Sequence, residues 1–361
     1  MEKERIYIAG PMCFYEDGYP RWDLMRDRAK VKGFDVTMPN ESDLIMDPVD
    51  LQKNAVTIFN NCARWMNETT AIICNLEFYR GPDVDGGSIY EMGMAYAKGS
   101  HCYGYTRDKR PMVWKYQGSQ LKEGIVYDQK GRPLPYAQLP FSPNVVGACK
   151  IVEGDFDDCL QVFALDMEEK RKLALFPPVS NLPLCSKPDS KEMPIVYLAG
   201  PDRFEADAPA RYERFKQLCL AKGLYPIVPT DPIPGIPPAE TGDPYTDAYL
   251  TFLRQQQHVR HCDILLADLN DFHGWEPDSD TSFECGMAFQ LGKKLFGYMK
   301  DTRRMIERIP SFGPERGYRD ACGCNAENFD FPINLMFAAS MPIYQADSFQ
   351  EALEQMAAAL K

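Results

Sequence analysis

Short apolar runs alternate with longer amphipathic stretches along most of the chain. Residues 71–74 (Ala-Ile-Ile-Cys) and 264–267 (Ile-Leu-Leu-Ala) are unbroken apolar runs, which are typical of strands buried on both faces of a parallel sheet. By contrast, residues 211–222 place apolar side chains such as Phe215 and Cys219 four positions apart, which is helical spacing. The pattern therefore predicts strands and helices in alternation.

The predicted elements form two series of the same kind. The first half has predicted strands at 5–9, 35–38, 71–74 and 102–105 and predicted helices at 22–32 and 49–66. The second half has predicted strands at 195–199, 225–228, 264–267 and 294–298 and predicted helices at 211–222 and 245–261. A further helix is expected between the third and fourth strands of each half. This alternation favours the α/β class, with open, mostly parallel sheets (Rossmann/flavodoxin-like) that carry helices on both faces.

Sequence motifs also repeat in the same order in the two halves. The segment YIAGP returns as YLAGP 190 positions later, and EMGMAY returns as ECGMAF 193 positions later. The repeated blocks contain Tyr7 and Tyr197, Glu91 and Glu284, and Asn144 and Asn334. Blocks that recur in order at nearly one offset indicate two copies of a single domain. We predict a first domain at 1–174, a proline-rich linker at 175–194 and a second domain at 195–361.

Charge and cysteine content narrow the possible functions. The formal net charge of −12 argues against a basic surface for nucleic acid or for an anionic membrane. No apolar stretch reaches the roughly 18–20 residues that a membrane span needs. Twelve scattered cysteines without a preceding signal sequence indicate reduced thiols in the cytoplasm. With four histidines and no phosphate-binding glycine loop, we expect neither a metal nor an organic cofactor.

Each copy carries a pair of acidic residues at one spacing, at the start of a predicted helix. Asp85 lies six positions before Glu91, and Asp278 lies six positions before Glu284. A glutamate in the first helical turn would be held ionised by the helix dipole, which suits a nucleophile. A second carboxyl beside it would stay protonated and act as an acid. Stabilisation of the helix alone is the other interpretation, but retention of the pair in both copies favours chemistry.

Two pairs of glycines agree with a ligand site at these positions. Gly10 and Gly200 follow the first strand of each copy and let the backbone turn tightly beneath a ligand. Gly93 and Gly286 lie two positions after each glutamate, where glycine weakens a helix. We therefore expect each of these helices to pack closely against its sheet or against a ligand.

At these residues the chain resembles the nucleoside 2-deoxyribosyltransferase family. The resemblance rests on a tyrosine in the first strand, the pattern D-x-G-[ST]-x-x-E-x-G-x-A and a later Asn-Leu-Met segment, and it covers nearly all of both copies. It implies transfer of a 2-deoxyribosyl group between nucleobases through a covalent glycosyl-glutamate, in nucleotide salvage. The partners implied are deoxynucleosides and free nucleobases.

Carried over by position, the resemblance gives each matched residue a role. Glu91 and Glu284 would be nucleophiles, oriented by Tyr7 and Tyr197, while Asp85 and Asp278 would contact the base and supply its proton. The substrate-binding residues would be Asp263, Asn144, Asn334, Gly200, Gly10 and Met336. In family members the asparagine reaches into a neighbouring subunit, which here implies a fused pseudo-dimer: Asn334 completes the first site and Asn144 the second. A larger homo-oligomer of this fused unit is also expected.

The two copies depart from the family pattern at different positions. The second copy has Asp263 entering its third strand where the first copy has Thr70, and it has Asp280 where the pattern requires glycine. We therefore expect unequal sites. The second copy retains all three acids and the tyrosine, so Glu284→Ala is expected to remove more turnover than Glu91→Ala.

Two other functions remain compatible with the same residues. A hydrolase would use water as the acceptor and cleave (deoxy)nucleosides or nucleoside monophosphates. In that case Arg80 or Arg203 would bind the phosphate, although a solvated loop arginine is the simpler interpretation of each. A non-catalytic nucleoside-binding protein is the third possibility, and an assay of base exchange distinguishes the three.

Overall fold

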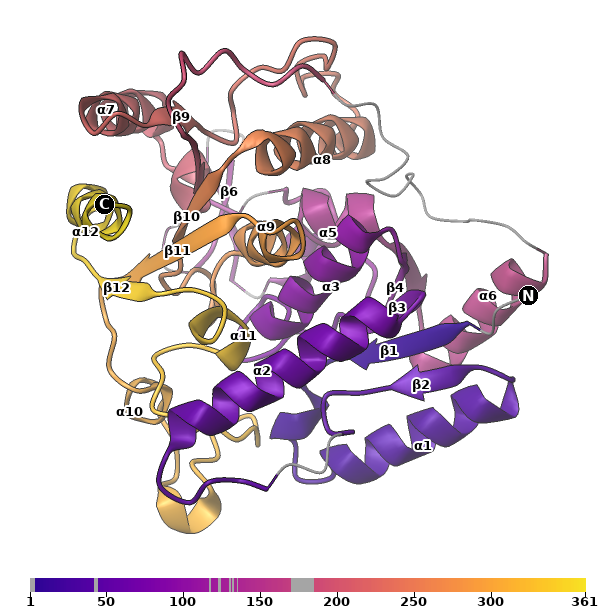
Figure 1. Cartoon of the computed structure of the whole chain (residues 1–361). Coiled ribbons are helices and arrows are strands. Elements are labelled where there is room, and N and C mark those ends of the chain that lie inside the picture. Colours follow the sequence, from indigo (N-terminus) through magenta and orange to yellow (C-terminus); the bar gives the residue numbers. More distant parts are fainter. Residues whose placement is uncertain are drawn as a thin grey trace.

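Each copy builds a five-stranded sheet in which all strands run parallel. The structure, a computed structural model, describes residues 4–41, 45–116, 118–122, 125–129, 131, 133–134, 136–169 and 185–361. The first sheet has the order β2-β1-β3-β4-β7, with strands β1 (Arg5–Ala9), β2 (Asp35–Thr37), β3 (Ala71–Asn75), β4 (His101–Thr106) and β7 (Lys150–Glu153). The second sheet has the order β9-β8-β10-β11-β12, with strands β8 (Ile195–Ala199), β9 (Tyr225–Ile227), β10 (Ile264–Asp268), β11 (Lys294–Met299) and β12 (Ile343–Gln345). The matching orders confirm the predicted α/β class and the duplication (Figure 1).

Long helices cover both faces of each sheet. Those of the first copy are α1 (Gly18–Val31), α2 (Leu51–Glu68), α3 (Gly86–Lys98) and α6 (Phe156–Glu168). Those of the second copy are α7 (Ala208–Ala221), α8 (Pro244–His261), α9 (Ser279–Gln290) and α12 (Phe349–Ala359). Short helices lie in the connections, namely α4 (Met112–Lys115), α5 (Pro143–Ala148), α10 (Met305–Arg308), α11 (Leu335–Ala338) and the 3-10 turns at Pro11–Phe14, Pro201–Phe204 and Pro314–Arg316.

The alternation of side chains along the strands creates one core shared by the two copies and two outer cores. In β1, Tyr7 and Ala9 point into the shared core, whereas Ile6 and Ile8 pack with α1 and α6 on the outer face. Strand β8 does the same, with its outer face against α7 and α12. Figure 1 shows α3 and α9 side by side between the two sheets. The copies are therefore joined through the helices that carry Glu91 and Glu284.

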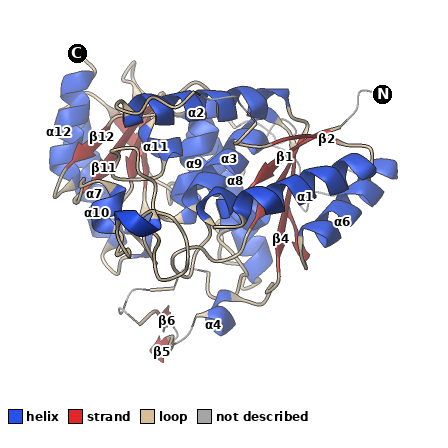
Figure 2. Cartoon of the chain, turned by 90° about the horizontal axis from the view of Figure 1, so that it is seen from below, coloured by secondary structure: helices blue, strands red, loops and turns tan. Residues whose placement is uncertain are grey.

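Several elements lie outside the predicted set. The fifth strands, β7 and β12, are short and only partly buried, so they lack the apolar run that identifies a strand from sequence. A two-stranded antiparallel hairpin, β5 (Gln120–Lys122) and β6 (Ile125–Tyr127), extends with α4 at one end of the first copy (Figure 2). Of the predicted linker, residues 175–184 lie outside the described residues, and residues 185–194 contain no helix or strand up to β8.

Glycines in α3 and α9 allow the two helices to cross in contact. A Cβ atom added at Gly93 would lie 2.1 Å from the carbonyl oxygen of Phe283, and one at Gly286 would lie 1.9 Å from the carbonyl oxygen of Tyr90. The predicted close packing of these glycines is thus present, but the predicted packing partner is wrong. Each glycine packs against the helix of the other copy rather than against its own sheet or a ligand.

A carboxylate from each copy also contacts the start of the other copy's central helix. Glu276 accepts a hydrogen bond from the backbone N–H of Gly86, at 3.3 Å. In the reverse direction, Asp83 accepts a hydrogen bond from the side chain of Ser279. These two hydrogen bonds join the start of α3 and the start of α9 to the other half of the chain.

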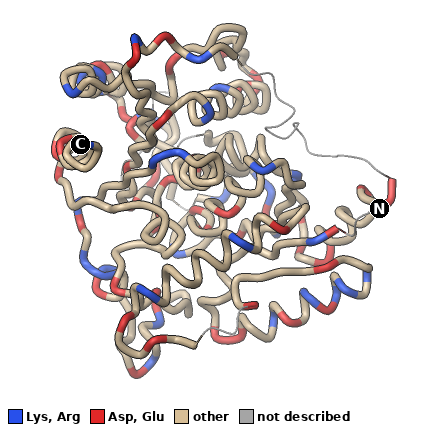
Figure 3. The backbone as a smooth tube through the Cα atoms, in the orientation of Figure 1, with Lys and Arg blue, Asp and Glu red and all other residues tan. Residues whose placement is uncertain are grey.

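Two global properties of the described residues complete the fold. No helix among them combines the length and the apolar character that a bilayer crossing requires. Lys and Arg residues are interspersed with Asp and Glu along the backbone (Figure 3).

Candidate active site

In the first copy, Glu91 projects from the second turn of α3 toward β1. The hydroxyl of Tyr7 donates a hydrogen bond to Oε1 of Glu91 at 2.5 Å. The carboxyl is buried, and burial raises its pKa to about 8, while the hydrogen bond from Tyr7 opposes the shift. The helix begins at Gly86, so the predicted first-turn position of the glutamate is wrong, and burial outweighs any help from the helix dipole.

Asp85 takes the position at the helix start instead, as the N-cap of α3. Its Oδ2 accepts the backbone N–H of Ser88 at 2.9 Å and also the Ser88 hydroxyl. Its Oδ1 is buried and has no hydrogen-bond partner among the described residues. Burial raises the pKa of this carboxyl, against the hydrogen bonds from Ser88 and the charge of Arg80. One oxygen is therefore held by the helix, while the other has no hydrogen-bond partner of this kind within the described residues.

A cavity of about 470 Å³ lies against these residues and is walled by both copies. Of the sequence-predicted site residues, Asp85, Glu91 and Gly10 line it from the first copy, and Asn334 and Met336 line it from the second. The side chain of Asn334 lies against the start of α3, because a Cβ atom at Gly87 would be 2.7 Å from its Nδ2. The structure thus brings Asn334 of the second copy to the wall of the cavity beside Glu91 of the first.

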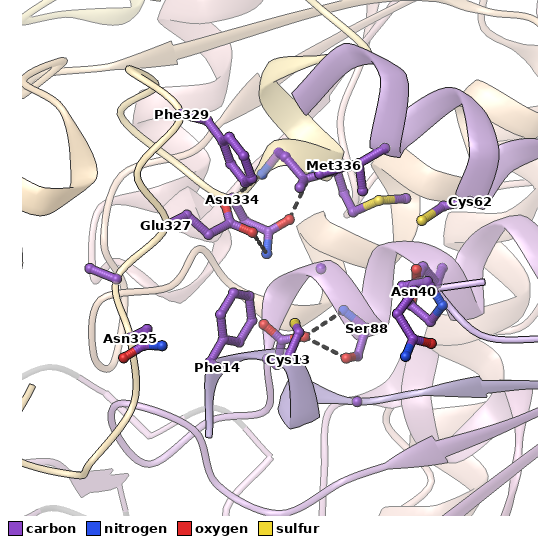
Figure 4. Close-up of a pocket in the computed structure, with 18 of the residues that line it drawn as sticks. Cys13, Phe14, Asn40, Cys62, Ser88, Asn325, Glu327, Phe329, Asn334 and Met336 are labelled. Atoms are coloured by element: carbon purple, nitrogen blue, oxygen red, sulfur yellow. Dashed lines mark hydrogen bonds between the residues drawn. The ribbon is translucent and has the colours of Figure 1, made fainter. Parts of the chain in front are cut away.

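Several lining residues have no signal in the sequence analysis. They are Cys13, Phe14, Trp22, Asn40, Cys62, Glu327 and Phe329. Among them, the indole Nε1 of Trp22 and Oδ1 of Asn40 are buried without a partner in the described part of the chain. Buried polar atoms in proteins almost always have partners, so these two are candidates for contacts with a ligand. Figure 4 shows Glu327 and Asn334 on one wall and Cys13 and Ser88 on the opposite wall.

The second copy keeps the same tyrosine–glutamate pair but surrounds it differently. The hydroxyl of Tyr197 donates to Oε1 of Glu284 at 2.7 Å. The guanidinium of Arg203 bonds Asp280 Oδ2 at 2.8 Å and Asp278 Oδ2 at 3.1 Å, and its Nη1 lies 4.0 Å from Glu284 Oε1. The arginine side chain is only 4% exposed. It therefore occupies the space among the three carboxylates, where the first copy has its cavity.

Two corresponding positions account for this difference. The third residue after the turn glycine is Cys13 in the first copy and Arg203 in the second. The second residue after the capping aspartate is Gly87 in the first copy and Asp280 in the second. Asp280 is fully buried, and burial raises its pKa to about 6 despite the charge of Arg203. The additional carboxylate in the second copy is matched by the additional arginine.

The other predicted residues of the second site lie around this cluster. The backbone N–H of Asn144 donates to Oδ1 of Asp280 at 2.9 Å, and its Nδ2 donates to the Asp280 carbonyl oxygen at 3.4 Å. The two turn glycines make equivalent close contacts. A Cβ atom at Gly200 would lie 2.9 Å from the Cβ atom of Asp268, and one at Gly10 would lie 2.9 Å from the Cβ atom of Asn75. Asn144 belongs to the first copy and reaches the site of the second copy, where it hydrogen-bonds Asp280.

Two sequence-based expectations need correction. Asp263 lies at the amino end of β10, where its carboxylate accepts hydrogen bonds from the Ile195 N–H at 2.8 Å and the Lys187 ammonium at 3.0 Å. Because the cavity beside Glu91 forms at the carboxyl ends of the strands, Asp263 lies at the opposite edge of its sheet, apart from the other predicted site residues. Arg80 and Arg203 are not solvated loop residues either: Arg80 is buried and pairs with Asp320 at 2.9 Å, and the side chain of Arg203 is only 4% exposed.

Each copy thus holds one tyrosine–glutamate pair near the carboxyl edge of its parallel sheet. A family model described as nucleoside 2-deoxyribosyltransferase matches residues 6–136 and 196–336. The chain belongs to this family and contains its domain twice.

Individual relatives are distant. An uncharacterised protein of Schizosaccharomyces pombe is 28% identical over 132 residues, which span 35% of this chain and 59% of that relative's length. A 2-deoxyribosyltransferase of Leishmania mexicana is 32% identical over 46% of this chain and 97% of its own, with a TM-score of 0.36. A 2-deoxyribosyltransferase of Bacillus psychrosaccharolyticus is 18% identical over 44% of this chain and 95% of its own, with a TM-score of 0.28.

Proposed function

We propose that the chain transfers a 2-deoxyribosyl group between nucleobases at one site, the cavity beside Glu91. The observation that carries this proposal is the contrast between the two motif glutamates: Glu91 borders the described cavity, whereas Arg203 lies beside Glu284. This reverses the expectation that the second copy is the more active one. The exchange would serve nucleotide salvage, as the resemblance implies, and the reduced cysteines favour the cytoplasm as its location.

The proposed reaction proceeds in two displacements at C1′ of the sugar. The ionised carboxylate of Glu91 attacks C1′, the bond from C1′ to the base nitrogen breaks, and the base leaves with a proton from Asp85. A second base then attacks C1′ of the glycosyl ester from the vacated side and returns a proton to Asp85, while the ester bond breaks. Two displacements give overall retention.

The side chains present suit these roles. A pKa of about 8 leaves part of the Glu91 population ionised at neutral pH, and the hydrogen bond from Tyr7 favours that charged form. Burial raises the pKa of Asp85 and so helps it to hold a proton. Residues of the first copy form one side of the cavity, and Asn334 and Met336 of the second copy contribute to its wall.

The lining also supports unphosphorylated nucleosides as substrates. The described residues around the cavity include the carboxyls of Asp85, Glu91 and Glu327, and none of them is a lysine, arginine or histidine. A 5′-phosphate would bring further negative charge into this acidic site without a cation to pair it. Arg80, the earlier candidate for a phosphate contact, is already bonded to Asp320 and to the carbonyl oxygen of Asn325.

Base exchange between a deoxynucleoside and a free base tests the proposal. Glu91→Gln keeps the shape and the hydrogen bond from Tyr7 but removes the nucleophile, so exchange should fall by at least about 10³-fold. Glu284→Gln is the matched variant in the second copy and should stay within a few-fold of the wild type. Release of free sugar without exchange would support a hydrolase instead. Equal losses in the two variants, or full activity of Glu91→Gln, would contradict the assignment.

A further inference from the structure

Glu327, a residue of the second copy, lies in the wall of the first copy's cavity and fixes the amide of Asn334. Its Oε2 accepts the backbone N–H of Leu335 at 2.9 Å, and its Oε1 accepts Nδ2 of Asn334 at 3.4 Å. Oδ1 of the same amide accepts the backbone N–H of Met336 at 2.9 Å. The amide therefore has a defined orientation, with oxygen toward α11 and nitrogen toward Glu327 (Figure 4).

The sequence position that corresponds to Glu327 carries no carboxyl in the second site. The residue seven positions before Asn334 is Glu327, whereas the residue seven positions before Asn144 is Ala137. The amide of Asn144 is held differently, because its Oδ1 accepts from Gln256 at 3.4 Å and its Nδ2 donates to the carbonyl oxygen of Asp280. A glutamate thus stands at this position beside the open cavity of the first site. The corresponding position for the second site, where Arg203 lies, is an alanine.

The position of Glu327 is unfavourable for stability by itself. It is close enough to Asp85 for their charges to interact, and burial raises its pKa to about 8, with Arg80 opposing the shift. A buried carboxyl among other carboxyls is costly unless it has partners. Both hydrogen bonds that it accepts come from one short segment of its own copy, so they leave acceptor capacity toward the cavity.

We propose that Glu327 is a positioning and specificity residue for the sugar. Its Oε1 accepts a hydrogen bond from one hydroxyl of the deoxyribose and keeps Nδ2 of Asn334 turned to donate to that same hydroxyl. This inference rests on the proposed function. It adds a recognition group that the second copy supplies to the first and that the closed site lacks.

The test measures base exchange for a full 2′-deoxynucleoside and for its 2′,3′-dideoxy and 2′,5′-dideoxy analogues. Glu327→Gln should lower kcat/KM for the full substrate roughly ten- to a hundredfold, the cost of leaving a buried hydrogen-bonding group without a matching partner. With the analogue that lacks the contacted hydroxyl, the wild type should already be slow, and the variant should be no slower. Glu315→Gln, an exposed glutamate of the same copy, is the matched control and should match the wild type on all three.

The outcomes separate the inference from the function beneath it. A loss that is equal on all three substrates, or no loss on any, overturns the role of Glu327 while exchange by the wild type still stands. The role is supported if Glu327→Gln keeps the melting temperature of the wild type and loses kcat/KM only on substrates that carry the contacted hydroxyl. A residue with a merely structural role would not distinguish the substrates. If the wild type exchanges no bases at all, the proposed function and this inference fall together.

Discussion

The two sites of this chain share their central pair and differ in what fills the space before it. In both copies a buried tyrosine donates to a buried glutamate, at 2.5 Å from Tyr7 and 2.7 Å from Tyr197. One pair faces a cavity, and the other faces the guanidinium of Arg203. Retention of a motif therefore says little about whether its site is open, because the residues around it decide access.

Charge balance explains the difference between the two sites. A guanidinium buried to 4% exposure needs acidic partners, and the second copy has added Asp280 beside Asp278 and Glu284. The first copy has Gly87 at the matching position, and its missing side chain leaves room for Asn334. Arginine and aspartate thus act as a complementary pair that closes one site, while cysteine and glycine leave the other open.

The largest expected effect comes from building the arginine into the first copy. Cys13→Arg should place a cation beside Asp85 and Glu91 and fill the cavity, so base exchange should fall to background. Cys13→Ser keeps the size of the side chain and should leave exchange within a few-fold of the wild type. Both are checked by initial rates of exchange together with melting temperatures.

A double variant controls for the possibility that Cys13→Arg loses activity because the protein misfolds. Combining Cys13→Arg with Gly87→Asp copies both residues of the closed site, so the protein should be folded and inactive. Substantial exchange by a folded double variant would show that the arginine does not exclude substrate, and the comparison between the two sites would lose its explanation.

The next effect is on stability and concerns the second copy. Arg203→Met removes the cation from Asp278, Asp280 and Glu284, and loss of one partner from a buried ion pair costs about 3–5 kcal/mol. Adding Asp280→Gly should recover part of that loss, because one unpaired carboxyl is removed with the arginine. Urea denaturation of the wild type, both single variants and the double variant measures this coupling.

If the two substitutions are instead additive, Asp280 and Arg203 do not stabilise each other, and the charge-balance account of the closed site is wrong. Base exchange in the double variant adds a second readout. Activity that survives Glu91→Gln in this background would show that the second site has been opened.

The strands and the tyrosine–glutamate pairs follow from sequence pattern, since buried parallel strands leave long apolar runs and the motif recurs twice. The open site does not follow from it. The placement of Arg203 among three carboxylates depends on tertiary packing, and neither Cys13 nor Glu327 belongs to any motif. Strand direction would have excluded Asp263, because a residue that enters a parallel strand lies at the edge opposite the site.

The smallest effect tests what the two sites have in common, the buried glutamate. Burial raises the pKa of both Glu91 and Glu284 to about 8, whereas an unfolded glutamate titrates near 4.3. The folded chain therefore binds more protons in this range, and the stability contributed by each glutamate is full below about pH 4 and is lost as the pH rises through 8. Glu91→Gln and Glu284→Gln should each flatten the fall in unfolding free energy between pH 5.5 and 7.5, by up to about 1.4 kcal/mol per pH unit, with exposed Glu315→Gln as the control. Flattening by Glu91→Gln alone would mean that Arg203 keeps Glu284 ionised, so that the two sites would differ in acidity as well as in access.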